Sequence, residues 1–279
     1  MPKSKLVLII PALLILSLVG FVAYRLLASS STQEITPPPA KRQIINAIPI
    51  PDRPFITLFP HQTNKLITLY MDKPGNTPEL TVDIEYLSGN SLKGGRTTIS
   101  LPTQLPFTQA FLLGSCSSGG KCSFDQDITT GTIKTKLEND TEINILKSNY
   151  VFIDGPSATT DQKLKFTPIK YTDTAILSYT HGYIGTYSDE VISEPFVITS
   201  ATSKDITGTL TLISDATGLA YYDGQDYQVL EEVEADNGQL TVNLDLKPWS
   251  KEVTIIRDDL KGESQDVTLY LVGPFLPLK

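Results

Sequence analysis

The chain has few side chains that could act as nucleophiles, general bases or soft metal ligands. Its 279 residues include two histidines, His61 and His181, and two cysteines, Cys116 and Cys122. A tetrahedral zinc site needs four nitrogen or sulfur ligands, and neither cysteine has a histidine or a third cysteine nearby in the sequence. Each histidine is isolated as well, so a nucleophile–base pair would need a partner brought close by the fold. We therefore expect no metal, no cofactor and no catalytic residue, and hence no enzyme.

The two cysteines flank a stretch rich in glycine and serine, GSCSSGGKC, at residues 114–122. A Walker A phosphate-binding loop has the pattern G-x-x-x-x-G-K-[ST] and opens a helix. Two glycines have the required spacing, but Gly120 stands where the lysine must be, and the following SFDQDI looks like a strand. The stretch therefore predicts a hairpin tip and no nucleotide binding. In an oxidising compartment we expect a Cys116–Cys122 disulfide to close this tip.

Tyrosines are concentrated in the second half of the chain. Seven of the 12 tyrosines lie between residues 171 and 227. Aromatic rings with a polar tip offer binding area at low entropic cost, including area for sugars. Tyrosine is also a common strand residue that is half buried for structural reasons, so a core role is the alternative. If this region binds a ligand, the candidate residues are Tyr179, His181, Tyr183, Tyr187, Tyr221 and Tyr222.

Acidic residues occur in small groups, at 223–226, 231–236 and 258–259. Such groups could supply oxygen ligands for Ca²⁺, or the two carboxylates with which a glycosidase works. None of them matches an EF-hand loop, so we interpret them as a solvated acidic surface. Small domains without long insertions offer little cleft for a polymer substrate. A carboxylate-based glycosidase is therefore kept only as the third hypothesis for function.

Beyond residue 54 apolar and polar residues alternate with a period of two, as in strands with one buried face. Turn signals separate the runs, and Asn237-Gly238 favours a type I′ hairpin. No convincing amphipathic helix follows residue 54. We expect a mainly β chain with two antiparallel β-sandwich domains of immunoglobulin-like or fibronectin-like type. The apolar-free GPSATTD sets their boundary, giving domains at 55–155 and 162–279, with 200–204 as the alternative boundary.

The N-terminal region predicts a membrane anchor. Residues 6–24 form an uncharged 19-residue run that nearly spans the bilayer as a helix. Lys3 and Lys5 precede the run, so the positive-inside rule places residues 1–5 in the cytoplasm and the rest outside. The alternative is a signal peptide cleaved after the small residues 28–30, although Arg25 would then interrupt its C-terminal end.

Residues 25–54 read as an extracytoplasmic spacer because they are rich in serine and proline. The chain holds 31 acidic and 23 basic residues. Of these, two acidic and six basic residues precede position 55, so the part beyond it is strongly acidic. An acidic balance argues against nucleic acid as a partner.

We therefore expect a single-pass membrane protein whose exported part is a non-enzymatic structural, adhesion or assembly module of the cell envelope. The expected partners are the bilayer, through 6–24, and envelope proteins or glycans. A receptor that binds a glycan or another ligand through the tyrosine-rich loops is the alternative.

Overall fold

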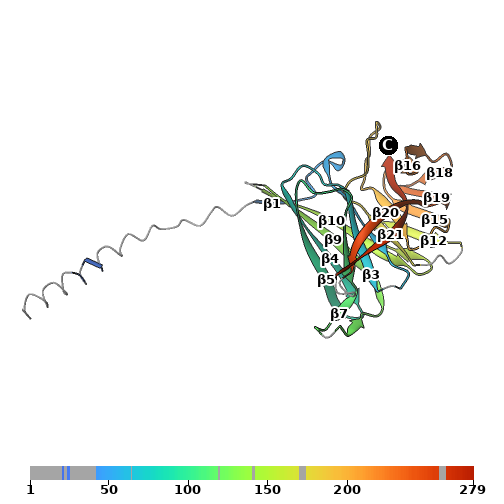
Figure 1. Ribbon diagram of the computed structural model, residues 1–279. Helices are drawn as coiled ribbons and strands as arrows, with labels where there is room; N and C mark the ends of the chain where they lie inside the picture. The colour runs from blue at the N-terminus through green and yellow to red at the C-terminus, as the bar shows by residue number, and fades with distance from the viewer. Residues whose placement is uncertain are drawn as a thin grey trace, which may run out of the picture. The chain divides into compact units, whose positions relative to one another are not determined.

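The computed structural model describes residues 21, 24–25, 42–63, 65–118, 120–139, 142–169, 174–257 and 262–279. Nearly all of these belong to one compact unit, Lys41–Lys279 (Figure 1). Apart from Phe21 and Tyr24, the predicted membrane segment 6–24 lies outside the described residues, as do residues 26–41 of the predicted spacer. Within the described ranges, no helix is both long enough and apolar enough to cross a bilayer.

The compact unit is built almost entirely from strands, so the prediction of a mainly β chain is confirmed. Its one short helix in the described ranges is the 3₁₀ helix η1 (Ile50–Asp52). The strands before residue 155 are β1 (Arg42–Ile45), β2 (Phe55–Pro60), β3 (Leu66–Lys73), β4 (Glu79–Ser88), β5 (Ser91–Ser100), β6 (Phe107–Leu112), β7 (Gly114–Cys116), β8 (Cys122–Phe124), β9 (Ile128–Glu138) and β10 (Glu142–Ile153). The later strands are β11 (Ser157–Ala158), β12 (Leu164–Pro168), β13 (Ala175–Tyr179), β14 (Phe196–Ser200), β15 (Ile206–Ile213), β16 (Gly218–Tyr222), β17 (Tyr227–Val229), β18 (Val233–Asp236), β19 (Gln239–Leu246), β20 (Trp249–Arg257) and β21 (Glu263–Leu278).

These strands form four sheets. The largest has 11 strands in the order β17-β16-β21-β14-β13-β10-β9-β4-β5, with β1 added at β10 and β20 at β21. The others are β11-β12-β15-β19-β18, β2-β3-β6 and β7-β8. Among the described strands, all pairings are antiparallel except that of β1 with β10. In Figure 1, β20 and β21 run between the group around β4 and β9 and the group around β15 and β19.

The five-stranded and the three-stranded sheets pack against the largest sheet and enclose separate cores. Against the five-stranded sheet, Phe166 and Leu210 pack with Leu177 of β13 and Ile198 of β14. Against the three-stranded sheet, a second core joins residues of β2 and β3 to residues of β4 and β9, among them Leu58, Leu69, Val82 and Ile133. Each of these two cores therefore lies between two sheets of the unit.

Strand β2 is buried along its whole length because it is covered on both sides. Phe55 and Phe59 pack with Leu269 and Leu271 of β21, whereas Leu58 belongs to the core with β4 and β9. Buried hydrogen bonds fasten β2 to the centre of the largest sheet: Thr57 Oγ1 lies 3.3 Å from Ser178 Oγ, and Thr199 Oγ1 donates to Leu58 O at 2.7 Å. Residues far apart in sequence therefore meet at this strand.

The largest sheet contains strands from both sides of the segment 155–161, where we expect the domain boundary. β10 ends just before that segment and pairs with β13, which follows it in the chain after β12, with Val151 opposite Leu177. The division into domains 55–155 and 162–279, and the alternative boundary at 200–204, remain predictions. If the chain has two such domains, the hydrogen bonds between β10 and β13 join them.

The predicted disulfide is confirmed. Cys116 and Cys122 face one another across β7 and β8, with their sulfur atoms bonded and their Cα atoms 4.0 Å apart. The hairpin that brings them together is the Gly/Ser-rich tip expected from the sequence. Both cysteines of the chain are therefore used in this one bond.

Candidate functional site

The predicted ligand-binding residues lie on or near one loop, residues 180–195, which joins β13 to β14. His181, Tyr183 and Tyr187 belong to the loop, Tyr179 ends β13, and Tyr221 and Tyr222 end β16. Hydrogen bonds hold the loop in place: Thr180 N donates to Pro195 O at 2.7 Å, and Ile192 N donates to Pro277 O at 3.0 Å. These bonds close the loop on itself and fix it to β21.

Three of the predicted tyrosines meet in an aromatic cluster, which we define as Tyr183, Tyr187, Tyr222, Tyr227 and Trp249. Tyr227 lies at its centre, with ring centroids 6.1 Å from Tyr183, 5.1 Å from Tyr187 and 5.3 Å from Tyr222. Trp249 stands edge-on to Tyr222 at 5.7 Å. The Tyr227 hydroxyl donates to Ile184 O at 2.9 Å, so this ring also braces the loop. Most of these contacts are edge-to-face, the arrangement that aromatic pairs favour.

Sequence reasoning missed Tyr227 and Trp249 as members of this cluster. Tyr227 lies opposite Tyr222 in the β16–β17 hairpin, whose turn begins with Asp223-Gly224. That turn signal could have placed the two tyrosines face to face. The position of Trp249 depends on the pairing of β20 with β21, and no local signal reports it.

The aromatic cluster has an acidic border and one cation. Asp223 and Asp226 lie exposed in the β16–β17 turn. Lys73 places its ammonium group 5.3 Å from the centroid of the Tyr183 ring, within the range of a cation–π contact. Tyr183 is only 4% exposed, whereas Tyr187, Tyr222, Tyr227 and Trp249 are partly exposed. The cluster therefore combines a buried base with a solvent-facing edge.

Of the other predicted residues, Tyr179 and His181 lie in the interior and Tyr221 is partly buried. Tyr179 is 5% exposed and packs in the core between the five-stranded and the largest sheet. Tyr221 packs against Phe275, with centroids 6.1 Å apart. His181 is 2% exposed, and its Nε2 lies 2.9 Å from Thr135 Oγ1. Burial, together with the nearby charge of Arg53, lowers the pKa of His181 to about 3. Its imidazole is therefore neutral at ordinary pH and is shielded from solvent.

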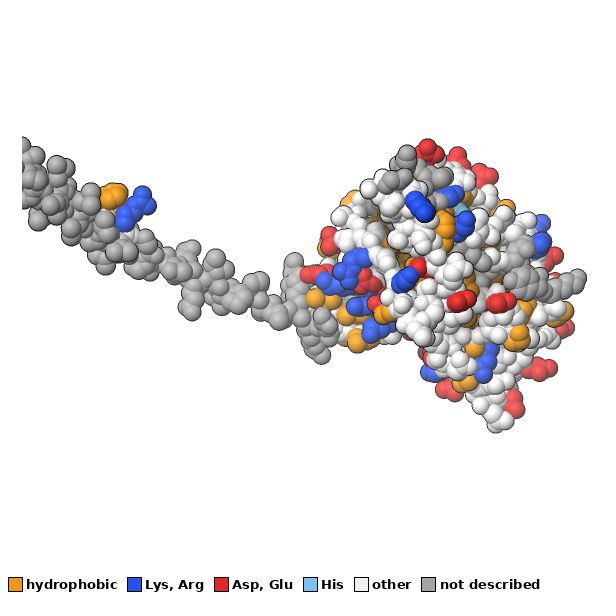
Figure 2. All heavy atoms as spheres, turned by 90° about the horizontal axis from the view of Figure 1, so that it is seen from below, with side chains coloured by type: hydrophobic (Ala, Val, Ile, Leu, Met, Phe, Trp, Pro, Cys, Tyr) orange, Lys and Arg blue, Asp and Glu red, His pale blue; other side chains and the backbone are white. Residues whose placement is uncertain are grey.

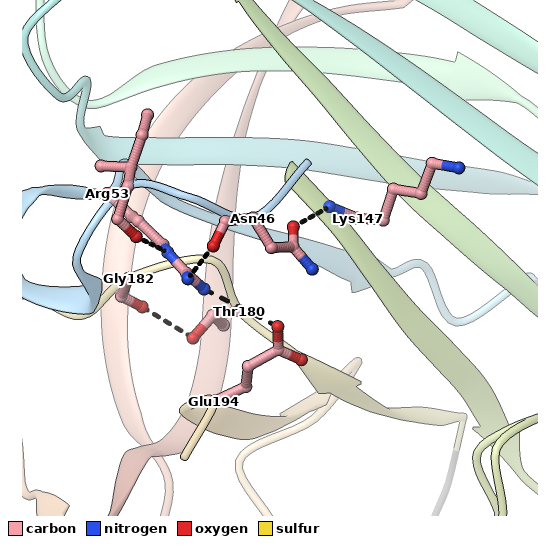
Figure 3. A network of polar contacts seen from close by, with 7 residues as sticks. Asn46, Arg53, Lys147, Thr180, Gly182 and Glu194 are labelled. Atoms are coloured by element: carbon pink, nitrogen blue, oxygen red, sulfur yellow. Dashed lines mark hydrogen bonds and ion pairs between the residues drawn. The ribbon is translucent and has the colours of Figure 1, made fainter. Parts of the chain in front are cut away.

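A buried arginine organises the polar contacts beside this loop (Figure 3). Arg53 is 7% exposed; its Nε donates to Ile48 O at 2.6 Å and its Nη2 donates to Asn46 O at 3.1 Å. Asn46 follows β1 with a positive φ of 50°, and its Oδ1 accepts a hydrogen bond from Lys147 N at 3.1 Å. Arg53 thus ties the end of β1 to the start of β2.

Gly182 allows the loop to approach Arg53 closely. Its N–H donates to Pro54 O at 2.9 Å, and a Cβ at this position would lie 2.4 Å from Arg53 O. Thr180 Oγ1 donates to Gly182 O at 2.7 Å and fixes the same turn. A side chain at 182 would therefore push the loop away from the arginine.

Arg53 also faces Glu194, the charged residue at the end of the loop. Arg53 Nη1 lies 3.7 Å from Glu194 Oε1, which is an ion pair but too long for a hydrogen bond. Burial lowers the pKa of Arg53, and the charge of Glu194 opposes that shift. Burial likewise raises the pKa of Glu194, with Arg53 opposing. In both groups desolvation outweighs the attraction between the partners.

A hollow of about 600 Å³ opens beside this ion pair. Arg53, Glu194, Asp161, Lys163 and Tyr179 contribute polar groups to its wall, and Ile50 contributes an apolar one. Ile50 also packs against Tyr183 and its neighbours, so the hollow and the aromatic cluster adjoin. In the described ranges no three His, Cys, Asp or Glu side chains gather as a metal site would require.

No family model matches this chain, and no curated protein matches its sequence.

Proposed function

We propose that this chain is a single-pass membrane protein that carries a non-enzymatic β-sandwich module of the cell envelope outside the cytoplasm. The observation that carries the proposal is the disulfide formed by the only two cysteines of the chain. Stable disulfides are typical of oxidising, extracytoplasmic compartments. The apolar run 6–24 and the Ser/Pro-rich stretch after it supply the anchor and the spacer of this plan.

The role that we propose is structural: adhesion, scaffolding or assembly. Two features support a role without catalysis. His181 is held neutral in the interior by burial, and both thiols are consumed in the disulfide. In the face of the unit shown in Figure 2, acidic and basic side chains are interspersed, which suits a soluble module presented to other envelope components.

The alternative is a receptor that uses the aromatic cluster. It is favoured by the convergence of Tyr183, Tyr187 and Tyr222 around Tyr227, with a partly exposed edge and an acidic border. Tyrosine and tryptophan carry much of the binding energy in protein interfaces. A protein or glycan of the envelope would contact this edge.

Protease treatment of intact cells tests the proposed location. A retained anchor predicts that protease added outside removes residues 25–279 and that the untreated protein stays in the membrane fraction. A soluble mature form beginning near Ser31 would show instead that the N-terminal segment is cleaved. Protection of the whole chain until the cells are lysed would contradict the extracytoplasmic location.

Site-specific photo-crosslinking in living cells tests the receptor alternative. A photoreactive residue in place of Tyr187 or Tyr222 should yield a discrete crosslinked product if the cluster is a binding surface. The matched control is the same residue in place of Tyr270, a partly exposed tyrosine outside the cluster. Equal crosslinking from all three positions would argue against a specific surface at the cluster.

A further inference from the structure

The hollow beside Arg53 has the size of a small-molecule site. Its volume of about 600 Å³ falls inside the range of about 300–1,000 Å³ that is usual for ligand pockets. Its walls come from separate elements: Ile50 from η1, Asp161 and Lys163 from the turn before β12, Glu194 from the loop 180–195, and Ser214 from the end of β15. These separate segments therefore keep the polar groups in place around the hollow even when no ligand is bound.

The ion pair at the wall has room for a bridging group. Arg53 uses Nε and Nη2 on backbone carbonyls, whereas Nη1 is separated from Glu194 Oε1 by 3.7 Å. An atom does not fit in line between them, but a hydroxyl oxygen to one side, at hydrogen-bond distance from both atoms, would accept from Nη1 and donate to Oε1. A hydroxyl is a donor and an acceptor at once, so one group would satisfy both partners.

The other polar groups of the hollow also offer both donors and acceptors. Asp161 Oδ1 accepts from Thr159 Oγ1 at 2.6 Å and from Lys163 N at 3.1 Å, which fixes its carboxylate and leaves Oδ2 as an acceptor. Lys163 adds an ammonium donor. Ser193 Oγ and Ser214 Oγ lie 3.1 Å apart and present a pair of hydroxyls.

The charges in the hollow are interleaved. Glu194 is within electrostatic range of Arg53 and Lys163, which are positive, and of Asp161, which is negative. Asp215 adds a third carboxylate to the wall, so the lining mixes Arg53 and Lys163 with carboxylates and forms no single cationic pocket of the kind that a phosphate or a free carboxylate would require. Burying a charged ligand group here would cost desolvation that neighbouring like charges would increase. Neutral hydroxyls avoid that cost, and Ile50 and Ile192 can pack against the C–H face of a ring.

We propose that this hollow binds a neutral polyhydroxylated ligand, the chemical class that includes the pyranose rings of glycans. The inference goes beyond the proposed envelope role, which assigns no ligand to the hollow, and it does not use the aromatic cluster. Arg53 and Glu194 share one hydroxyl of the ligand, Asp161 and Lys163 hold another, and the isoleucines cover one face of the ring.

Ligand-observed NMR titration of the purified full chain tests this inference, in a detergent that has no sugar headgroup. The probes are the methyl glycosides of glucose, galactose, mannose and N-acetylglucosamine. Glucuronate, glucosamine and alanine serve as anionic, cationic and zwitterionic comparisons. We expect saturable binding of at least one neutral glycoside, and weaker binding of all three charged compounds.

Two conservative variants locate the binding. Glu194→Gln and Asp161→Asn each remove one charge-assisted hydrogen bond, so each should weaken the neutral glycoside about tenfold or more. Asp161 is exposed and Asn keeps its turn contacts, so this variant should fold even if Glu194→Gln does not. The matched control is Asp245→Asn, an exposed carboxylate on β19 outside the hollow, which should bind as the unaltered chain does.

Three outcomes would overturn the inference. The first is that no neutral glycoside binds saturably. The second is tighter binding of glucuronate, glucosamine or alanine than of every neutral glycoside. The third is binding that survives both Glu194→Gln and Asp161→Asn but is lost in Tyr187→Ala, because the aromatic cluster would then be the site. None of these outcomes bears on where the chain is anchored.

Discussion

At the scale of single residues, burial decides what the titratable side chains of this protein can do. His181 is one of two histidines and would be an obvious candidate for a general base. It is buried, however, and its imidazole is hydrogen-bonded to the Thr135 hydroxyl. Arg53 and Glu194 show the same effect in a pair, because desolvation moves both pKa values against their charged forms. A buried ion pair of this kind is weak evidence for stability, because desolvation offsets much of the attraction between its partners.

His181 should make the fold sensitive to acid. Its pKa is lowered from 6.5 to about 3, so below pH 6.5 the unfolded chain takes up a proton that the folded chain refuses. Stability should therefore fall as the pH drops from about 6.5 toward 3, by up to about 1.4 kcal/mol per pH unit from this residue. Urea denaturation at pH 7, 6 and 5 measures the slope, which should be flatter in His181→Gln.

The other histidine provides the control for this experiment. His61→Gln removes an imidazole that is partly exposed. Its pH slope, measured alongside, separates the effect of the buried imidazole from the effect of removing an imidazole. If His181→Gln and the unaltered chain lose stability equally between pH 7 and 5, titration of His181 does not contribute.

Within the aromatic cluster, Tyr227 should matter more for stability than Tyr187. Tyr227→Ala removes three ring contacts and the hydrogen bond to Ile184 O, and we expect a loss of about 3 kcal/mol. Tyr227→Phe removes only the hydroxyl and should lose about 1 kcal/mol. Tyr187→Ala leaves the remaining rings in contact and should also lose about 1 kcal/mol. Chemical denaturation measures the free energy of unfolding of all three variants. Equal losses in Tyr227→Ala and Tyr187→Ala would mean that Tyr227 is not the centre of the cluster.

At the scale of elements, hairpins are the units that the sequence specifies most directly. The β18–β19 hairpin turns at Asn237 and Gly238, which have φ values of 50° and 75°. The β7–β8 hairpin is likewise a local feature, and its disulfide links positions six residues apart. Both are set by neighbouring residues and need no information from the rest of the fold.

Loss of the Cys116–Cys122 bond should destabilise the protein modestly. A disulfide that closes so short a loop restricts the unfolded chain little, and the chain-entropy model gives about 2 kcal/mol. We expect the double variant Cys116→Ser, Cys122→Ser to fold with a lower melting temperature. Reducing agent should lower the melting temperature of the unaltered chain by a similar amount and leave the double variant unchanged. An effect of reductant on the double variant would mean that it acts elsewhere.

The sequence predicts the strands with one buried face better than those buried on both. Leu80, Val82 and Ile84 alternate with polar residues, and β4 is found there. β13 and β14 read AILSY and FVITS, and every residue in them is buried, so no alternation marks their faces. The pairing of Arg53 with Glu194 was also beyond reach, because it depends on how β2 meets the loop after β13. The concentration of tyrosines in one region of the sequence pointed to three residues of the cluster. Which of the candidate tyrosines are buried and which are partly exposed could be learned only from the fold.

At the scale of the whole molecule, the central strands belong to more than one core. In β13, Leu177 packs with the five-stranded sheet while Ile176 packs with the core of β2, β3 and β4. In β14, Ile198 and Val197 likewise face opposite sides. Loss of one core would therefore remove the support of the other.

The compact unit should consequently unfold in a single transition, even though the sequence predicts two sandwich domains within it. Differential scanning calorimetry of the full chain should give a calorimetric enthalpy equal to the van't Hoff enthalpy. Phe166→Ala in one core and Leu69→Ala in the other should each move the whole transition to lower temperature. Two separate transitions, with each variant shifting only one, would show that the halves are independent.

The hydrogen bonds that join β2 to the middle of the largest sheet also affect how fast the protein folds. Thr57 and Ser178 are 121 residues apart in the chain, and Leu58 and Thr199 are 141 apart. A chain must search longer to bring such distant segments together, and all-β proteins dominated by distant contacts fold in about milliseconds to seconds. During that interval the apolar strands β2, β13 and β14 are uncovered and prone to aggregation. We therefore expect the yield of folded protein to depend on how slowly the chain is produced and on whether a holding chaperone is present.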